Sequence, residues 1–309
     1  MSRRALLLFS AMSLIWGVPY LLIKVALGGV EPAFLVFART AIGAVVLLPV
    51  ALRRRQVLPA LRSWRPLLAF ATLEIALPWL LLNDAEQHLT SSLSGLLIAT
   101  VPLIGTLLAW FLGDRTVLGR GRLLGLGVGM AGVAAVVGLD LGSASGLRMA
   151  EVVLVAVGYA IAPVIADRHL GGVPPVAVIS VSLTAVALAY VPAAVFLHPH
   201  AWPRVSVLAA IVALGLVCTA AAFLLFFKLI AEIGPLHSTV ITFVNPAVAV
   251  ALGMLVLREP FTLGVAVGFP LVILGSRLST RGAGAHAVPV RSPLAAVGAE
   301  SAGELSAHG

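Results

Sequence analysis

The stretch GLLIATVPLIGTLLAWFLGDR, residues 95–115, contains no charged side chain before Asp114. A helix needs about 20 apolar residues to cross roughly 30 Å of hydrocarbon, so this stretch is long enough to span a membrane. The composition of the whole chain agrees, because 61% of its 309 residues are hydrophobic and only 10% are charged. A soluble domain carries about 25% charged residues. The sequence therefore predicts a membrane protein.

Similar stretches recur along the chain, most of them about 17–23 residues long and free of charged side chains, as membrane-spanning helices are. The connections between them are short, so the fold class predicted is an all-α polytopic membrane protein. The N-terminal apolar run is too long for a signal peptide and is expected to stay as the first helix. The ten predicted transmembrane helices are residues 5–27, 32–52, 66–83, 91–112, 123–139, 149–166, 174–197, 205–227, 236–257 and 261–278.

Lysine and arginine indicate the orientation, because basic loops stay on the cytoplasmic side. With a cytoplasmic N-terminus, most basic residues fall inside and the outer side keeps Arg148, Arg204 and Arg258. Both termini are thus predicted to be cytoplasmic, including a disordered Gly/Ala/Ser-rich tail at 281–309. The same rule explains the net charge of +8, so nucleic-acid binding is not expected. Cys218 is the only cysteine, which excludes an intrachain disulfide.

The second half of the chain repeats the first at an offset of 143 or 144 residues. The predicted repeats are residues 5–139 and 149–278, each with five helices. An odd number of helices turns the second copy upside down in the membrane, as in transporters that build one site between inverted repeats. The offset superimposes Pro32 on Pro175, Pro49 on Pro192, Ser94 on Ser238, Pro102 on Pro246, Gly125 on Gly268 and Gly132 on Gly275.

Four motifs carry a resemblance to a known family. They are IWGVPYLLIK (15–24), FLVFART (34–40), the opening stretch, and STVITFVNPAVAVALGMLVLREPFTLG (238–264). In this order and spacing they resemble the EamA-like transporters of the drug/metabolite transporter superfamily, over roughly residues 5–278. The resemblance implies a secondary transporter of the bacterial inner membrane, often an exporter of amino acids, other metabolites or drugs. It also implies a central cavity shared by the two halves.

Aromatic residues in the first helix are candidates for lining such a cavity. Trp16, Tyr20 and Lys24 recur every four residues and so lie on one helical face. The repeat offset superimposes Trp16 on Tyr159, and the stripes of the two halves are expected to face each other if the halves pack about a twofold axis. Pro19 is expected to bend the helix at this level. The alternative is that these aromatic side chains anchor the helix at the membrane surface, and that Lys24 reaches toward water.

Two charged residues are predicted deep in the membrane. Arg39 lies about seven residues into the second helix and Glu74 about eight residues into the third, which is roughly 10–12 Å at 1.5 Å per residue. Charges at this depth usually face a water-filled cavity or pair with each other. Arg39 and Glu74 are therefore either substrate-binding residues or a structural ion pair.

The stretch ALPWLLLNDAEQHLTSS, residues 76–92, collects polar side chains where the third helix is expected to leave the membrane, near Asn83. Most of them fit a simple turn on the outer side. Its resemblance to the helix-three end of a subgroup of EamA-like proteins favours Glu86 and Gln87 as candidates for gating or first contact. Trp79 is a further substrate-binding candidate in this stretch. Asn245, directly before Pro246, is a further candidate. A proline inside a helix leaves carbonyl groups without an intrahelical partner, and these groups could accept hydrogen bonds from a substrate.

Other functions have less support. The chain has no G-x-x-x-x-G-K-[ST] loop, so ATP-driven pumping is not indicated, and no cofactor or metal site is expected. A non-transporting scaffold or receptor would not need Arg39 and Glu74 deep in the membrane. A membrane-embedded enzyme has little support, because Ser91 and Ser92 near His88 lack a nucleophile-elbow pattern and a third group to orient the base. The predicted function is export of a small organic solute. Proton coupling through Glu74 or Glu86 and uncoupled diffusion both stay open. Glycine faces in helices five and ten predict a seam between the halves or a homodimer contact.

Overall fold

The structure is a computed structural model and describes residues 2–113, 119–140, 146–238 and 241–280. Every regular element in these ranges is a helix, so the predicted all-α class is confirmed. The predicted tail at 281–309 lies outside the described residues. The α-helices are α1 (Arg3–Gly17), α2 (Pro19–Ala26), α3 (Pro32–Arg53), α4 (Val57–Arg62), α5 (Trp64–Ala71), α6 (Leu77–Glu86), α7 (Ser91–Ile98), α8 (Val101–Phe111), α9 (Arg120–Asp140), α10 (Gly146–Leu170), α11 (Pro175–Ala189), α12 (Val191–Phe196), α13 (Val205–Gly215), α14 (Ala222–Ser238), α15 (Ile241–Leu255) and α16 (Leu263–Thr280).

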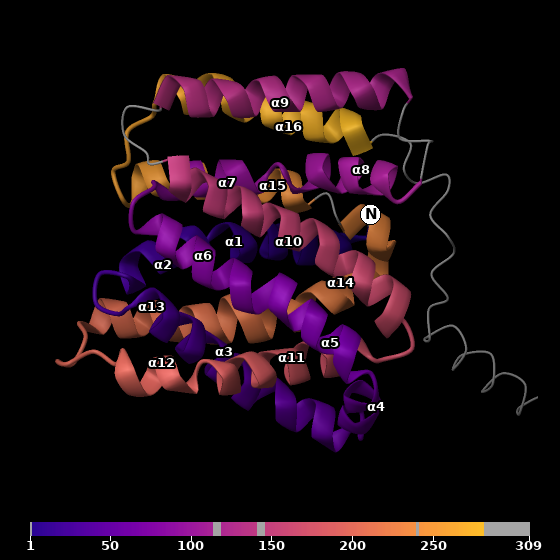
Figure 1. Ribbon diagram of the computed structural model, residues 1–309, viewed down its shortest axis with the longest axis vertical. Coiled ribbons are helices and arrows are strands. Elements are labelled where there is room, and N and C mark those ends of the chain that lie inside the picture. Colours follow the sequence, from indigo (N-terminus) through magenta and orange to yellow (C-terminus); the bar gives the residue numbers. More distant parts are fainter. Residues whose placement is uncertain (1, 114–118, 141–145, 239–240, 281–309) are drawn as a thin grey trace, which may run out of the picture.

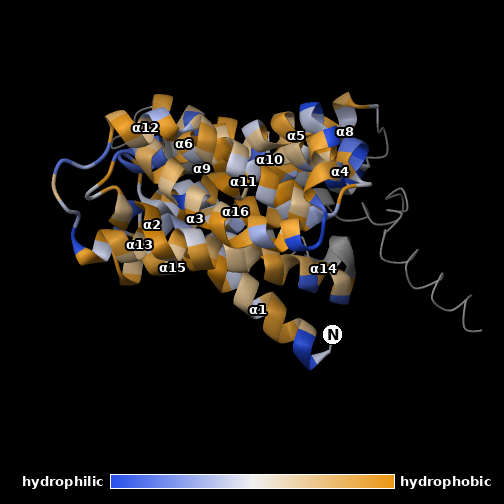
Figure 2. Cartoon of the chain, turned by 90° about the horizontal axis from the view of Figure 1, so that it is seen from below, coloured by the Kyte–Doolittle hydropathy of each residue, from blue (hydrophilic) through white to orange (hydrophobic). Residues whose placement is uncertain are grey.

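Six helical stretches are long and apolar enough to cross a membrane, and shorter apolar helices accompany them. In Figure 2 hydrophilic residues gather toward the two ends of the bundle, whereas apolar residues cover most of the helices between them. This is the pattern of a multi-pass membrane protein. The six stretches are Arg3–Ala26, Pro32–Arg53, Trp64–Glu86, Ser91–Phe111, Gly146–Leu170 and Val205–Ile233.

Within the part of the chain that the structure describes, two π-helical turns interrupt long helices. The turn η1 (Thr72–Ala76) joins α5 to α6, and η3 (Leu216–Ala221) joins α13 to α14. Their starting residues differ by 144 positions, the offset of the sequence repeat. The same local distortion thus occurs at the same place in both halves. Such turns often mark functional sites in helices, because they redirect side chains.

Equivalent helices of the two halves pack against each other. The helix α3 lies along α11, α7 along α15, and α9 along α16. Two further contacts are related by the repeat. In the first, α2 of the first predicted helix packs against α13 of the eighth. In the second, α10 of the sixth packs against α6 of the third. Figure 1 shows α9 beside α16 at one edge of the bundle, with α3 and α11 toward the opposite edge. The halves therefore interlock along their whole length.

The contact between α9 and α16 depends on glycine. A Cβ atom added to Gly275 would lie 2.2 Å from the Gly129 nitrogen, and one added to Gly132 would lie 2.7 Å from the Val272 nitrogen. The two backbones touch at these points, so no side chain fits between them. Glycines of helix five thus meet helix ten between the halves, and on helix ten the close contact is at Gly275.

Several helices extend past the boundaries that hydropathy predicted. The third helix was expected to end near Asn83, but α6 continues to Glu86. The ninth was expected to begin at residue 236, but α14 continues to Ser238 and α15 begins at Ile241. The cause is the same in both places. A hydropathy pattern places the end of a helix at its first polar side chains. The helix itself can continue past that point when those side chains lie in water or are buried in the protein.

Candidate functional site

Three buried side chains from different helices lie at one level of the bundle. Tyr20 of α2, Arg39 of α3 and Trp79 of α6 are 8%, 8% and 6% exposed. Each lies about seven residues, or roughly 10 Å, from the end of its helix. These three helix ends lie at the side of the bundle where α2 turns into α3, on the left in Figure 1. The basic-residue rule predicts that this side is the outer one.

The guanidinium group of Arg39 is held by neutral partners. Its Nε donates to Thr219 Oγ1 at 3.0 Å, and its central carbon lies 3.6 Å from the centre of the Trp79 ring. The Thr219 hydroxyl in turn donates to the Leu214 carbonyl, five residues earlier, at 2.8 Å. The π-helical turn η3 thereby directs the threonine oxygen toward Arg39. A desolvated cation–π contact of this kind contributes about 2 kcal/mol.

Arg39 and Glu74 do not form the ion pair that the sequence left open. Within the described residues, no carboxylate lies within ion-pair distance of Arg39, and Glu74 is half-buried in η1. Glu74 instead lies within electrostatic range of Tyr159 on α10. Among the described residues, the positive charge of Arg39 is therefore not neutralised by an ion pair with a neighbouring helix.

Tyr159 and Tyr20 belong to the same region of the bundle. Tyr159 packs against the core cluster that contains Tyr20, and both lie within electrostatic range of Arg39. We call Tyr20, Arg39, Trp79, Tyr159 and Thr219 the central cluster. It combines aromatic surfaces with one cation, a combination that suits a small amphipathic organic solute.

Glu86 is the most deeply buried carboxylate near the central cluster. It is 0% exposed, and neither of its carboxylate oxygens has a hydrogen-bond partner in the described structure. The ammonium group of Lys24 donates to the main-chain carbonyls of Glu86 and Leu89, at the end of α6. Lys24 thus caps a helix end and leaves the Glu86 side chain without a direct partner.

Three of the predicted site residues lie away from the central cluster. Trp16 packs against Phe223 and Phe226 of α14, with a ring separation of 4.7 Å to the second. Gln87 is exposed on the turn after α6. The sequence prediction grouped these with Tyr20 and Glu86 because they are close along the helix, but the break at Pro19 and the end of α6 separate them in space.

Asn245 is the third of these residues. With its amide nitrogen facing the two carbonyls, it donates to Ile241 at 3.1 Å and to Ser13 at 3.2 Å. The first bond lies within α15 and the second joins α15 to α1. Asn245 therefore stabilises a helix contact in this structure.

The sequence interpretation missed Glu259, which lies between α15 and α16. Its carboxylate accepts hydrogen bonds from the main-chain nitrogens of Ser91 (2.7 Å) and Ser92 (3.0 Å) and from the Ser92 hydroxyl (2.7 Å). These nitrogens begin α7, where helices leave unpaired N–H groups and favour negative charge. Gly253 makes room, since a Cβ there would lie 2.3 Å from a Glu259 oxygen. The contact joins the second half to the first.

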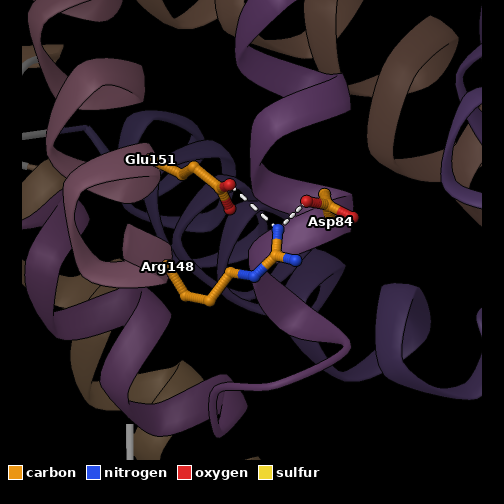
Figure 3. A network of polar contacts seen from close by, with 3 residues as sticks. All are labelled: Asp84, Arg148 and Glu151. Carbon is orange, nitrogen blue, oxygen red and sulfur yellow. Dashed lines mark hydrogen bonds and ion pairs between the residues drawn. The ribbon is translucent and has the colours of Figure 1, made fainter. Parts of the chain in front are cut away.

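A second polar contact joins the halves at the same side. Arg148, at the start of α10, bonds to Asp84 of α6 and to Glu151 Oε1 at 2.9 Å. Figure 3 shows the guanidinium between the two carboxylates. We call this group and the Glu259 contact the outer latches. Neither could be read from the sequence, because the partners lie 64 and about 168 positions apart.

The family model for EamA-like transporters matches the chain twice, at residues 3–138 and 148–281. The chain belongs to the EamA-like transporter family. This match confirms the resemblance seen in the sequence motifs. The EamA-like family is a family of membrane transporters. The two matches correspond to the two copies of the sequence repeat.

Other comparisons support the fold of this EamA-like chain. One solved crystal structure has 21% sequence identity, covers 89% of this chain and 96% of its own, and superimposes with a TM-score of 0.64. At this identity the likeness shows a shared fold alone. The curated proteins contain no significant match.

Proposed function

We propose that this protein is a secondary transporter that moves a small amphipathic organic solute outward by alternating access around the central cluster. The observation that carries the proposal is the position of Arg39. It is buried deep in a membrane bundle, stacked on Trp79, and has no anionic partner among the described residues. A scaffold or receptor has no use for such a costly group, whereas a transporter uses it to bind solute.

We propose that ten transmembrane helices form two inverted five-helix units, at 5–139 and 149–278. The paired π-helical turns and the packing of equivalent helices support this arrangement. In such transporters one half rocks against the other around a fixed site. The central cluster has members from both halves, since Thr219 and Tyr159 come from the second, so relative motion of the halves would change access to it.

We propose that the outer latches close the external path in this conformation. They contain two hydrogen-bonded carboxylates that join the halves. At the other end, the described residues include one ion pair between α1 and α14, Arg4 to Glu232 at 3.8 Å, with Arg4 73% exposed. Exposed pairs of this kind contribute about 0–1 kcal/mol. The inner end would therefore open first.

Counterflow in liposomes tests the function. The purified protein is reconstituted, and exchange of labelled phenylalanine, uridine and benzyltrimethylammonium against the same unlabelled solute is measured. These probes represent a zwitterion, a neutral polar solute and a permanent cation. We expect exchange of at least one of them above protein-free liposomes. If none exchanges, and a wider set of organic anions also fails, the transporter proposal is wrong and the scaffold alternative gains support.

Cysteine labelling tests the inverted arrangement. In a Cys218→Ser background, we expect Glu31→Cys and His200→Cys to react with an impermeant thiol reagent added outside cells. Arg54→Cys and Gly172→Cys should react only after the membrane is opened. The loops at residues 31 and 172 are equivalent in the repeat, so an inverted arrangement puts them on opposite sides. Labelling of both from the same side would exclude it.

Glu259→Gln should weaken the contact between the halves. The amide keeps one acceptor, but its NH2 group would face the N–H groups of Ser91 and Ser92, so at least one charge-assisted hydrogen bond is lost. We expect a loss of stability of about 1–3 kcal/mol, measured as a lower thermal midpoint in detergent. Glu232→Gln is the matched control, because its exposed pair should contribute little. Equal midpoints for both variants would remove Glu259 as a latch.

A further inference from the structure

The surroundings of Glu86 differ from those of every other buried ionisable group near the central cluster. Arg39 has a hydrogen bond to Thr219 and a stacked ring, and Lys24 bonds to two main-chain carbonyls. Both oxygens of Glu86 are sealed from solvent without a hydrogen bond. An unpaired carboxylate anion in such a place is costly. The group must therefore be accompanied by a proton or by a counter-ion that reaches it.

The charged groups around Glu86 identify its available counter-ion. The groups within electrostatic range of Glu86 are Lys24 and Tyr20 of α2, Arg39 of α3, and Glu259 from the segment before α16. On α10, Arg148 is engaged with Asp84 and Glu151. Arg39 is anchored by Trp79 and Thr219. Lys24 alone combines a flexible stem with an ammonium group already at the end of α6.

We propose that Glu86 is the proton-binding site that couples transport to a proton gradient, with Lys24 as its alternative counter-ion. This inference rests on the proposed transport function. In one state a proton from water forms an O–H bond with a Glu86 oxygen, and Lys24 caps α6. In the other state that bond breaks, the proton leaves to water, and the Lys24 ammonium moves from the carbonyls to the carboxylate. One proton is bound and released per cycle.

The exchange would act on the outer latches through the chain itself. When Lys24 leaves the carbonyls of Glu86 and Leu89, the turn that leads into α7 loses its support. Ser91, the first residue of α7 and a partner of Glu259, follows Leu89 by two positions. Deprotonation of Glu86 would thus loosen the latch to the second half. This gives proton release a direct mechanical consequence.

Glu74 is the competing candidate, and the structure favours Glu86 over it. Glu74 is only partly buried, and it is not among the buried carboxylates that lack a hydrogen-bond partner, as Glu86 is. It also lies about three helical turns away from the α6–α7 connection, far from the latches. A proton on Glu74 has no described contact through which to act on the second half at the outer side.

The test uses reconstituted full-length protein and the probe that exchanges best among phenylalanine, uridine and benzyltrimethylammonium. Uptake of the probe is measured with a pH difference of one unit across the membrane, in each direction, and again without a pH difference. The ratio of uptake with the gradient to uptake without it is the accumulation ratio. One proton per cycle permits up to about tenfold accumulation. We expect wild type to accumulate severalfold, Glu86→Gln to give a ratio of about one, and Glu74→Gln to resemble wild type. Glu232→Gln serves as the matched control for loss of a carboxylate that lies outside both the central cluster and the outer latches.

The outcomes separate the two proposals. Exchange without any response to pH in wild type would overturn the coupling proposal and leave the transport function intact. So would a gradient response that survives in Glu86→Gln or is lost in Glu74→Gln instead. Failure of wild type to exchange any probe would count against both proposals. The wild-type measurement stands even if the Glu86→Gln protein cannot be recovered.

Discussion

Replacement of Gly275 by leucine should reduce the recovery of folded protein at least tenfold. A Cβ at this position would lie 2.2 Å from the nitrogen and 2.4 Å from the Cα of Gly129, and 2.7 Å from the Gly125 carbonyl oxygen. These are main-chain atoms of α9, so they cannot move aside as a side chain could. The two helices would have to separate, and with them the two halves. Yield of the monodisperse peak in detergent gives the measurement.

Gly127→Leu is the control on the same helix. Nothing lies within 4 Å of a Cβ at Gly127, which lines an open groove on the outer face of α9. We expect its yield to stay within about twofold of wild type, because an added side chain there enters free space. Normal recovery of Gly275→Leu would show that α9 and α16 do not meet as closely as described. A large loss for both variants would point to a contact on the outer face instead.

Arg39→Met should leave the protein folded and lower exchange at least tenfold. The partners of Arg39 are a hydroxyl and an aromatic ring, so its removal leaves no buried charge uncompensated. Thr219 keeps its bond to Leu214, and a thioether packs well against Trp79. Stability should therefore change by only about 1–2 kcal/mol. Exchange should fall further, because the central cluster loses its cation.

The matched control is Arg65→Met. Arg65 also lies over a tryptophan ring, that of Trp64, at 5.3 Å, but on an exposed part of α5. Loss of this surface cation–π contact should leave both yield and exchange near wild type. If Arg39→Met cannot be recovered but Arg39→Met/Glu74→Leu can, the two residues act as a structural pair. In that case the central cluster would not be the solute site.

The sequence alone determined the membrane environment, the helices and the repeat. The length and hydropathy of a local stretch decide whether it can form a membrane-spanning helix, so these features can be read from the chain without knowledge of its packing. The break at Pro19 followed for the same reason, since proline removes its own N–H group. The family motifs, such as the one that contains Arg39, were equally local.

The tertiary structure decided which polar groups meet. It placed Arg39 with Thr219, 180 positions away, instead of with Glu74. It also moved Trp16 and Asn245 into helix contacts and brought Glu259 to the start of α7. Hydropathy gives the depth of a side chain along its helix but not the rotation of that helix or its neighbour. A buried polar group is stabilised by a partner at about 3 Å, and only the packing of all the helices decides which partner lies there.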